Sequence, residues 1–391
     1  MKYNFDKVID RSGTSAEKVE GLKHIWGRTD LIPLWVADMD FATAPFVTDA
    51  IRKRCENEVL GYTGKPDSYY NAIINWVKQR YDLIVTKEVI NFVPGIVPGI
   101  GMAMNCFTQK GDKVMIQPPV YHPFAWVTTR NDRTLVINPL RWENGMYRMD
   151  LDAFREQIKG CKLFILCNPH NPGGVVWTEA ELRAIADICY DEKVLVFSDE
   201  IHADLTLPPH THRPFATVSE KARMNSVTFM SPSKAFNMPG LSASHALIFN
   251  EDLRKRFRIY MDAGELDMGH VFAFLSVEAA YSHGTEWLDQ CLAYIQGNID
   301  FVDEFLKKHA PKIKAIRPEA SYLVWLDCRE LELSQKDLNE FFVDKAHLAL
   351  NDGEMFGKEG IGFMRLNVAS PRCIIEKAMK QLADAYQLYI K

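Results

Sequence analysis

The stretch Ser231-Pro232-Ser233-Lys234-Ala235-Phe236-Asn237 decides the fold of this chain when it is compared with Ser198-Asp199-Glu200-Ile201-His202. Lys234 follows two serines, and the β-branched run at residues 227–229 before them is typical of a strand. Asp199 follows another apolar run, at residues 194–197. Ligands of open α/β sheets bind at the carboxyl ends of the strands. The two segments therefore predict a site with a carboxylate on one strand end and an amine after the next.

Size and composition are those of a globular protein of about two domains. The chain has 391 residues, of which 47% are apolar and 25% charged. The net charge is −5, and no run of Lys and Arg indicates nucleic-acid binding. The charged N-terminus is unlike a signal peptide, and no apolar run has the roughly 18 residues of a membrane span. Eight cysteines without a C-x-x-C pair favour reduced thiols, so we expect a cytoplasmic protein.

Apolar runs alternate with amphipathic helical patterns through the middle of the chain. The runs that predict strands are residues 114–116, 135–137, 163–166, 194–197 and 227–229. A helix is predicted over 178–190, where Thr178 and Glu181 have the spacing of a capping box. Near-continuous apolar strands separated by helices predict an α/β fold, with a mostly parallel central sheet and helices on both faces.

The pattern changes after residue 284. A predicted helix at 286–309 is followed by short strands at 315–316, 322–326 and 363–366, and by helices at 334–344 and from Pro371. We therefore expect a large domain over 43–284 and a smaller C-terminal α/β domain over 285–391. Residues 1–42 have few regular patterns, and we expect them to pack with the smaller domain.

Pyridoxal 5′-phosphate (PLP) needs an amine, a carboxylate and hydroxyl groups, and the opening segments contain all three. The amine of Lys234 would form a Schiff base with its aldehyde and later remove the substrate's α-proton. Asp199 would keep the pyridine nitrogen protonated, and Ser231 and Ser233 would bind the phosphate. Each residue also has a simpler interpretation: a helix cap, a surface lysine and a turn. Their combination favours the cofactor.

Three further segments add to this pattern. Gly95, between a predicted strand at 90–93 and a predicted helix at 98–107, allows an anion to approach a helix N-terminus. Two Asn-Pro turns leave Asn171 free to hydrogen-bond a phenolate oxygen. Arg365 lies in an apolar strand, where a guanidinium needs a carboxylate partner, either a substrate's or one of the protein's own. A plain turn remains an alternative interpretation for the Gly95 segment, and a rigid loop for the Asn171 segment.

The order of these segments resembles the fold-type-I PLP-dependent enzymes of the aminotransferase class I/II superfamily. Within it, the chain looks like the MalY/PatB-type branch of cystathionine β-lyases (cysteine-S-conjugate β-lyases, or C–S lyases). The resemblance runs nearly end to end. It is carried by LWVADMDF at 34–41, GY at 61–62, PVYHPF at 119–124, CNPHNPGG at 167–174, SDEIHAD at 198–204 and SPSKAFN at 231–237. Ser242 departs from the superfamily, since many aminotransferases have a phosphate-binding arginine there, and Pro98 is also unexpected.

The resemblance implies roles for the residues around the cofactor ring. Lys234 would be the Schiff-base lysine and Asp199 the partner of the ring nitrogen. Asn171 would contact the ring's O3′, and His202 would reach O3′ or pack beside it. Tyr121 would stack on the ring.

The resemblance also implies how phosphate and substrate are held. The backbone amides of Ile96 and Val97, with the two serines, would bind the phosphate. Tyr62 would reach the site across a dimer interface, so we expect a homodimer. Arg365 would bind the α-carboxylate of a small amino-acid substrate, with backbone near Ala37 closing the site.

The resemblance implies β-elimination from cystathionine or a related cysteine S-conjugate, giving a thiol, pyruvate and ammonia. The alternative is a PLP-dependent aminotransferase, which shares the lysine, the aspartate and the arginine. A regulatory protein that holds PLP and acts by binding a partner is a weaker alternative. No metal site is expected, because His210 and His212 stand among prolines, which favours an exposed loop.

Overall fold

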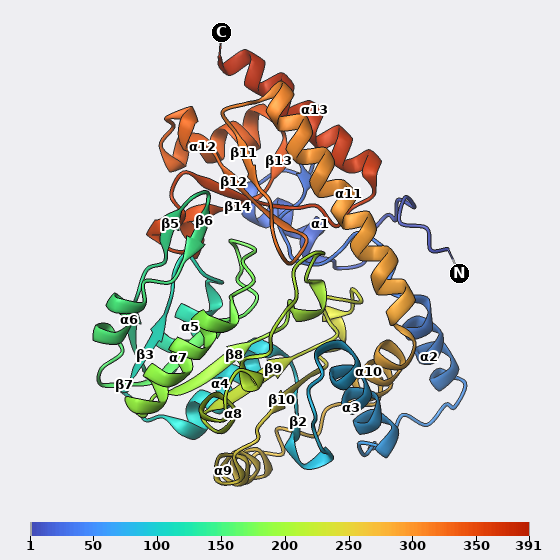
Figure 1. Cartoon of the computed structure of the whole chain (residues 1–391). Coiled ribbons are helices and arrows are strands. Elements are labelled where there is room, and N and C mark those ends of the chain that lie inside the picture. Colours follow the sequence, from blue (N-terminus) through green and yellow to red (C-terminus); the bar gives the residue numbers. More distant parts are fainter. Residues whose placement is uncertain (1, 391) are drawn as a thin grey trace.

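A seven-stranded sheet forms the centre of the larger part of the molecule (Figure 1), in a computed structural model that describes residues 2–390. The strand order is β2-β10-β9-β8-β7-β3-β4. β10 runs antiparallel to both neighbours, and the pairs from β9 to β4 are parallel. The strands are β2 (Ile90–Val93), β3 (Lys113–Ile116), β4 (Thr134–Ile137), β7 (Cys161–Cys167), β8 (Leu195–Asp199), β9 (Ser226–Met230) and β10 (Ser244–Leu247). The predicted mostly parallel sheet is confirmed.

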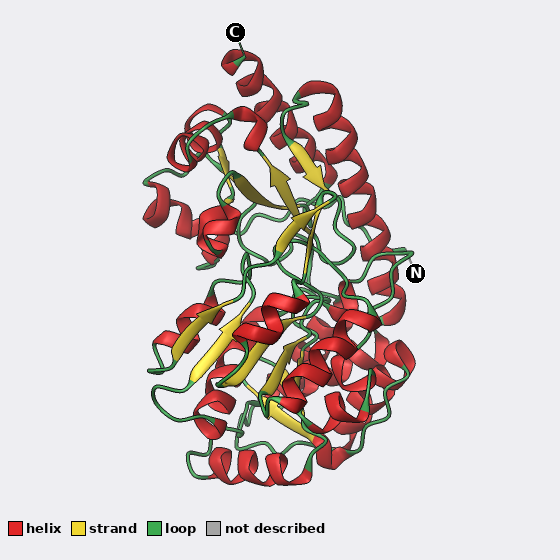
Figure 2. Ribbon diagram, turned by 60° about the vertical axis from the view of Figure 1, so that its left-hand side comes forward, coloured by secondary structure: helices red, strands yellow, loops and turns green. Residues whose placement is uncertain are grey.

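Helices cover both faces of this sheet (Figure 2) because its strands are apolar on both sides. Along β7, Leu163 and Ile165 pack into one core cluster, and Phe164 and Leu166 pack into another. The first cluster contains side chains of α4 (Ile96–Phe107), α5 (Pro123–Thr129) and α9 (Glu251–Asp262). The second contains side chains of α6 (Leu151–Gln157), α7 (Glu179–Asp191) and α8 (Glu220–Met224). A third cluster includes residues of α2 (Pro45–Cys55), α3 (Asp67–Tyr81) and α10 (Val271–His283).

A second, antiparallel sheet lies at the top of Figure 1, in the order β11-β12-β15-β14. Its strands are β11 (Lys314–Ile316), β12 (Leu323–Asp327), β14 (Asn351–Asp352) and β15 (Phe363–Asn367). The long helices α11 (Thr285–His309) and α13 (Arg372–Tyr389) run beside it. A short hairpin, β5 (Arg141–Glu143) with β6 (Met146–Arg148), faces this sheet from the larger part.

The predicted helix at 334–344 is wrong over its last turn. The α-helix α12 ends at Glu340 (Gln335–Glu340), and a π-helical turn follows at Phe341–Lys345. The wider turn leaves two consecutive aromatic side chains, Phe341 and Phe342, both buried in the same core cluster. The regular α-helical hydrogen-bond pattern therefore stops at Glu340, because a π-helical turn bonds residues five apart rather than four.

The N-terminal segment contains more regular structure than expected. It forms the helix α1 (Glu17–Trp26) and the short strand β1 (Ile32–Pro33), which pairs in parallel with β13 (Leu348–Ala349). The signal for α1 was weak because its buried face includes Lys18 and Gly21, of which the glycine lies against the ring of Trp35. The domain boundaries at residues 42 and 284 stay a prediction.

Two helix starts follow from local chemistry. Thr178 caps α7, and both hydrogen bonds of the capping box with Glu181 are present, which confirms that prediction. α4 begins at Ile96, two residues before the predicted start. Pro98 fits there because the first turn of a helix does not use its N–H groups, and the first bond runs from Gly99 N–H to the carbonyl of Gly95.

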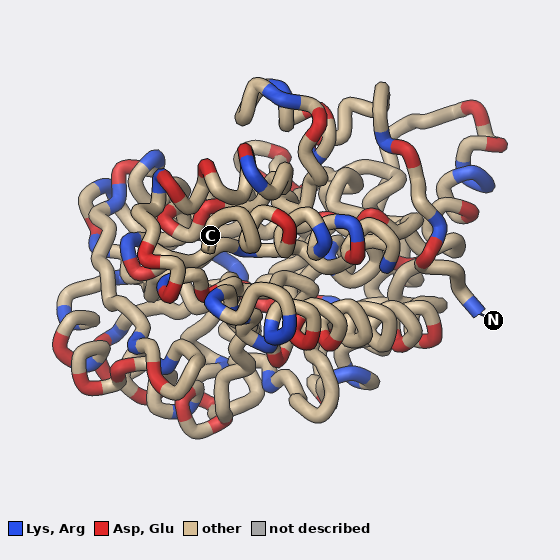
Figure 3. The backbone as a smooth tube through the Cα atoms, turned by 90° about the horizontal axis from the view of Figure 1, so that it is seen from above, with Lys and Arg blue, Asp and Glu red and all other residues tan. Residues whose placement is uncertain are grey.

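Charges of both signs are interspersed along the chain, as Figure 3 shows from above. No long stretch of Lys and Arg stands alone in this view, in agreement with the net charge of −5. Among the helices of residues 2–390, none is both long and apolar enough to cross a membrane.

Candidate active site

A cavity of about 210 Å³ opens at the carboxyl ends of the parallel strands, which is the ligand side of such a sheet. It is lined by residues from the loops that follow β2, β7, β8 and β9, together with Tyr121 and Ala37. The lining contains eight of the eleven residues predicted from sequence: Ile96, Val97, Tyr121, Asn171, Asp199, His202, Ser233 and Lys234. Residues that are distant in sequence therefore meet in one place.

Asp199 is the last residue of β8, and its side chain is buried. Burial raises the pKa of its carboxyl to about 7, since the charged form loses its hydration. One carboxylate oxygen accepts the N–H of Ile201 at 3.1 Å. The described residues give Asp199 no ion-pair partner, so a cationic group placed in the cavity would stabilise its charged form.

Lys234 lies in the turn after β9, and burial lowers the pKa of its amine to about 8. The amine donates a hydrogen bond to the carbonyl oxygen of Ala37 at 2.6 Å. A buried amine with a lowered pKa is a better nucleophile and base near neutral pH than a surface lysine. Lys234 is therefore no surface lysine, and that simpler interpretation is wrong.

The start of α4 can receive an anion. Gly95 has φ of 147°, in the region that favours glycine, and places the first turn of α4 against the cavity. The N–H groups of Ile96 and Val97 belong to the first turn, where no helical carbonyl is available to them. Together with the helix dipole they favour a phosphate or carboxylate at this end.

The two serines before Lys234 play different structural parts. Ser233 lines the cavity, whereas Ser231 does not. The hydroxyl of Ser231 accepts the N–H of Ser233 at 3.1 Å and lies 2.7 Å from both the Ser233 hydroxyl and the carbonyl oxygen of Ala243. Ser231 thus holds the turn that presents Ser233. Ser242 and Ser244 also line the cavity.

Arg365 is buried in β15 and reaches the site from the second sheet. Its guanidinium donates to Asn171 Oδ1 at 3.1 Å, to the carbonyl of Trp35 at 3.2 Å and to Asn351 Oδ1. It also lies 4.8 Å from the centre of the Phe356 ring. Burial lowers the pKa of Arg365 to about 10.

No carboxylate among residues 2–390 pairs with Arg365, and its Nε atom is buried without a partner. The alternative of an internal salt bridge is therefore wrong. An unpaired guanidinium with a free N–H is a strong binding group for a ligand carboxylate.

Two aromatic side chains complete the walls. Tyr121 lines the cavity, and its ring lies 5.8 Å from that of Phe124. His202 also lines it, and its Nδ1 atom is buried without a hydrogen-bond partner. Burial lowers the pKa of His202 to about 3, so the ring is neutral and one of its nitrogens can accept a hydrogen bond.

Tyr62 does not line the cavity within one chain. Its side chain is 99% exposed, on the segment between α2 and α3. The neighbouring Val59 and Leu60 are also exposed, at 72% and 57%. Three apolar or aromatic side chains in four positions therefore point into solvent in a single chain.

Sequence reasoning missed part of the cavity and misplaced one histidine. Ser244 lines the site, but no local pattern marks it, because it reaches the cavity through the pairing of β10 with β2. His212 was expected in an exposed loop and is instead buried, with its Nε2 atom 2.8 Å from Glu200 Oε2. His210 does lie partly in solvent. No cluster of three or more metal-ligating side chains exists among the described residues.

The donor set fits PLP on structural grounds. Two free N–H groups at α4 and the Ser233 hydroxyl suit a phosphate. Asp199 lacks a cation, Lys234 offers an amine, and the orphaned nitrogen of His202 and amide of Asn171 suit a phenolate oxygen.

Known proteins resemble this chain along its whole length. The model of the aminotransferase class I and II family matches residues 29–382. Cystathionine beta-lyase PatB of Bacillus subtilis is 38% identical over 384 residues, which are 98% of this chain and 99% of that protein. A PLP-bound putative aminotransferase from Clostridium difficile 630 shares 40% identity with a TM-score of 0.96, covering 98% of this chain and 100% of the other. The PLP-bound C-S lyase from Staphylococcus hominis shares 35% identity with a TM-score of 0.91, covering 99% and 98%.

These likenesses agree with the architecture described above. The mixed, mostly parallel sheet with its cavity at the strand ends is the fold-type-I arrangement that the sequence predicted. The family expected from the sequence is confirmed. The chain belongs to the aminotransferase class I and II family.

Proposed function

We propose that this protein is a PLP-dependent C–S β-lyase that cleaves cystathionine or a related cysteine S-conjugate to a thiol, pyruvate and ammonia. One observation carries the proposal: the amine of Lys234 and the carboxylate of Asp199 line one cavity, while Arg365 is left without a carboxylate. The identity to a protein named cystathionine beta-lyase, over 98% of the chain, favours elimination.

Asp199 and Lys234 have different chemical roles in the proposed reaction. When bound, PLP supplies an aldehyde for the amino group and a ring that accepts the electron pair left at Cα. Asp199 would keep a proton on the ring nitrogen, because burial disfavours its charged form and a cation beside it restores that form. Lys234 Nζ takes the proton from Cα of the substrate. Loss of that proton allows the thiolate on Cβ to leave.

The remaining residues bind and orient. Arg365 holds the α-carboxylate of the substrate, which fixes Cα near Lys234. Tyr121 would pack against the cofactor ring, and Asn171 and His202 would hydrogen-bond its phenolic oxygen. The start of α4 and Ser233 would hold the phosphate.

The test is a substrate panel with two readouts. Purified protein with PLP is given cystathionine, cysteine and S-alkyl cysteines, and both pyruvate and thiol are measured. Release of both in equal amounts, lost in Lys234→Ala, supports the lyase. Absence of pyruvate from every substrate would refute it.

An aminotransferase is the second candidate, because the Clostridium difficile relative is titled a putative aminotransferase. In the same panel, a keto acid is added and amino-group exchange is measured. Exchange that is faster than pyruvate release would replace the lyase by this candidate. A protein that binds PLP but turns over nothing in either assay would point to the regulatory alternative.

We also propose that the protein acts as a homodimer in the cytoplasm, with Tyr62 completing the site of the partner. The exposure of Tyr62, Val59 and Leu60 supports the interface, and the absence of disulfides among the eight cysteines supports a reducing compartment. Tyr62→Ala and Lys234→Ala chains, each inactive alone, should regain activity when mixed, because half of the sites in a mixed dimer carry neither change. Mixtures that stay inactive would contradict a shared site.

A further inference from the structure

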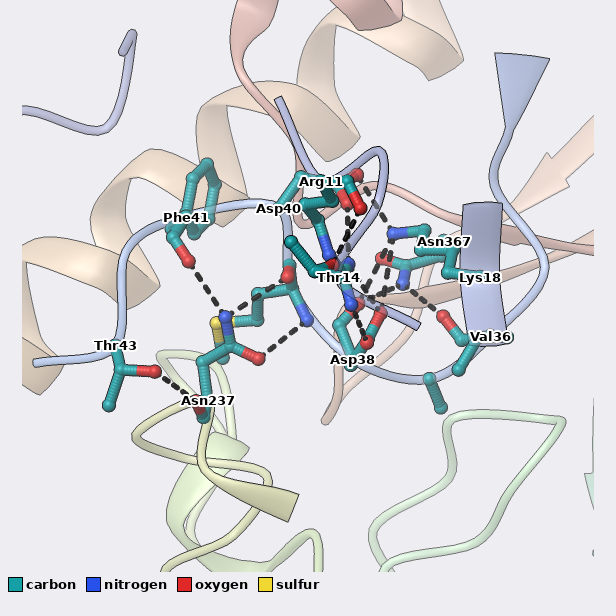
Figure 4. A network of polar contacts seen from close by, with 12 residues as sticks. Arg11, Thr14, Lys18, Val36, Asp38, Asp40, Phe41, Thr43, Asn237 and Asn367 are labelled. Carbon is teal, nitrogen blue, oxygen red and sulfur yellow. Dashed lines mark hydrogen bonds and ion pairs between the residues drawn. The ribbon is translucent and has the colours of Figure 1, made fainter. Parts of the chain in front are cut away.

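The segment of residues 36–41 is fixed by side chains from distant elements (Figure 4). It contacts Lys234 through the carbonyl of Ala37. Asn237, three residues after Lys234, accepts the N–H of Met39 at 3.0 Å. It also donates to the carbonyls of Met39 and Phe41, at 3.0 and 2.7 Å. These bonds tie the segment to the same turn that carries the lysine.

A second amide binds the segment from β15. Asn367 Nδ2 donates to the carbonyls of Val36 and Asp38, each at 2.7 Å. The two bonded carbonyls flank residue 37, whose own carbonyl accepts from Lys234 Nζ at 2.6 Å and from the Tyr322 hydroxyl at 3.0 Å. The carbonyl of Ala37 is therefore held against the amine by bonds on both sides.

Asp38 joins this segment to a cluster of charged side chains, Arg11, Lys18 and Asp40. Its carboxylate accepts two hydrogen bonds from Arg11, at 2.6 and 3.2 Å. Its carbonyl lies 3.3 Å from the fully buried amine of Lys18, which also bonds Asp40 at 2.8 Å. A bidentate Arg–carboxylate pair fixes direction as well as distance. The N-terminal segment thus sets the orientation of Asp38.

Charged and titratable groups face Lys234 from several elements. Burial lowers the pKa of its amine, Asp38 and Asp199 oppose that effect, and Arg365 adds to it. His202, which burial keeps neutral, lines the same cavity. Asp40 lies in the same cluster as Asp38 but is not among the charges that act on Lys234.

We propose that Asp38, oriented by Arg11, is a positioning residue for the amine of Lys234. It holds the Ala37 carbonyl in place, so that the neutral amine donates one hydrogen there and turns its lone pair into the cavity. Its negative charge also balances the positive charge of Arg365 at the amine. The inference rests on the proposed function in one respect, namely that Lys234 reacts with PLP.

The test follows PLP itself as it binds to the full-length protein freed of cofactor. Lys234 attacks the aldehyde carbon, a C=N bond forms and one water is released, and the change in absorbance gives a rate at each pH. Only the neutral amine reacts, so the rate rises with pH and its inflection reports the pKa of Lys234. We expect the inflection of the unmodified protein near pH 8.

Asp38→Asn is compared with Asp40→Asn, a change of the same kind in the same cluster. We expect Asp38→Asn to lower the inflection by about one pH unit, because a carboxylate that favours the ammonium form is gone. It should also slow the limiting rate at high pH several-fold. Asp40→Asn should leave the pH of the inflection unchanged, even if its free energy of unfolding is lower because Lys18 has lost an ion-pair partner. Equal shifts in both variants, or none in Asp38→Asn, would overturn the proposal.

Replacing Arg11 tests the orientation of Asp38 without removing the charge of Asp38. Arg11 is partly exposed, so its replacement is compatible with folding. Arg11→Gln should slow the limiting rate several-fold without lowering the inflection, since it removes a positive charge. Arg11→Lys should restore most of the rate. An unchanged rate in Arg11→Gln would also overturn the proposal.

The outcomes keep this proposal apart from the proposed function. Failure of the unmodified protein to change absorbance with PLP would refute the cofactor assignment itself. Failure to release pyruvate, with normal PLP binding, would refute the lyase and leave the role of Asp38 to be decided by the variants.

Discussion

Replacing Asp199 by Asn in the cofactor-free protein should make its free energy of unfolding less sensitive to rising pH. Asp199 is buried, and its carboxyl has a pKa of about 7 against 3.8 for an exposed aspartate. The folded state therefore holds a proton that the unfolded state has already released over this range. Because folding binds the proton, the free energy of unfolding falls as pH rises from about 4 to 7.

The size of the effect follows from the same two pKa values. The difference corresponds to about 4 kcal/mol in all, and to about 2.5 kcal/mol between about pH 5 and pH 8. Asn has the same shape and does not titrate, so the free energy of unfolding of Asp199→Asn does not fall through this titration. We expect the variant to gain about 2.5 kcal/mol relative to the unmodified protein over that interval.

The assay is urea unfolding of both cofactor-free proteins at several pH values in this interval. The gain is read as the change in the difference between their unfolding free energies, which cancels the titration of all other groups. Parallel pH dependences would show that Asp199 is not held neutral by burial. With PLP bound, the unmodified protein should instead have the higher free energy of unfolding, because the ring nitrogen then pairs with the charged carboxylate that the variant lacks.

Three further changes test other parts of the molecule. Arg365→Lys keeps the charge but loses the fork of donors, so kcat/KM should fall about 10- to 100-fold through a weaker hold on the α-carboxylate; an unchanged KM for every amino acid would contradict that role. His212→Leu removes a partner of the buried Glu200, and unfolding should become easier by about 3 kcal/mol; the exposed His210→Leu serves as its control. Gly353→Ala places a Cβ atom in steric overlap with the carbonyl oxygen of Gly360, so a lower unfolding temperature is expected. Gly111→Ala is its control, because that Cβ meets no atom within 4 Å and is strained only by its φ of 85°.

The cofactor motif and the positions of most strands of the central sheet were accessible from the sequence because they are local or short-range signals. The apolar strands ending at Asp199 and before Lys234, and the capping box at Thr178, each depend on neighbouring residues. The missed elements had no such signal. Helix α1 buries a lysine and a glycine, which breaks the amphipathic pattern, and the π-helical turn at Phe341–Lys345 is set by packing.

The sequence by itself determined the fold class from the spacing of its apolar runs. Its resemblance to a known family determined the family and eight side chains that meet in one cavity. Only the tertiary structure decided what surrounds them. It left Arg365 without a carboxylate, placed Ser231 where it supports Ser233, buried His212 against Glu200 and brought the Ala37 carbonyl against the amine of Lys234. These contacts join residues tens to hundreds of positions apart or depend on burial, and burial is a property of the packed chain rather than of any segment of it.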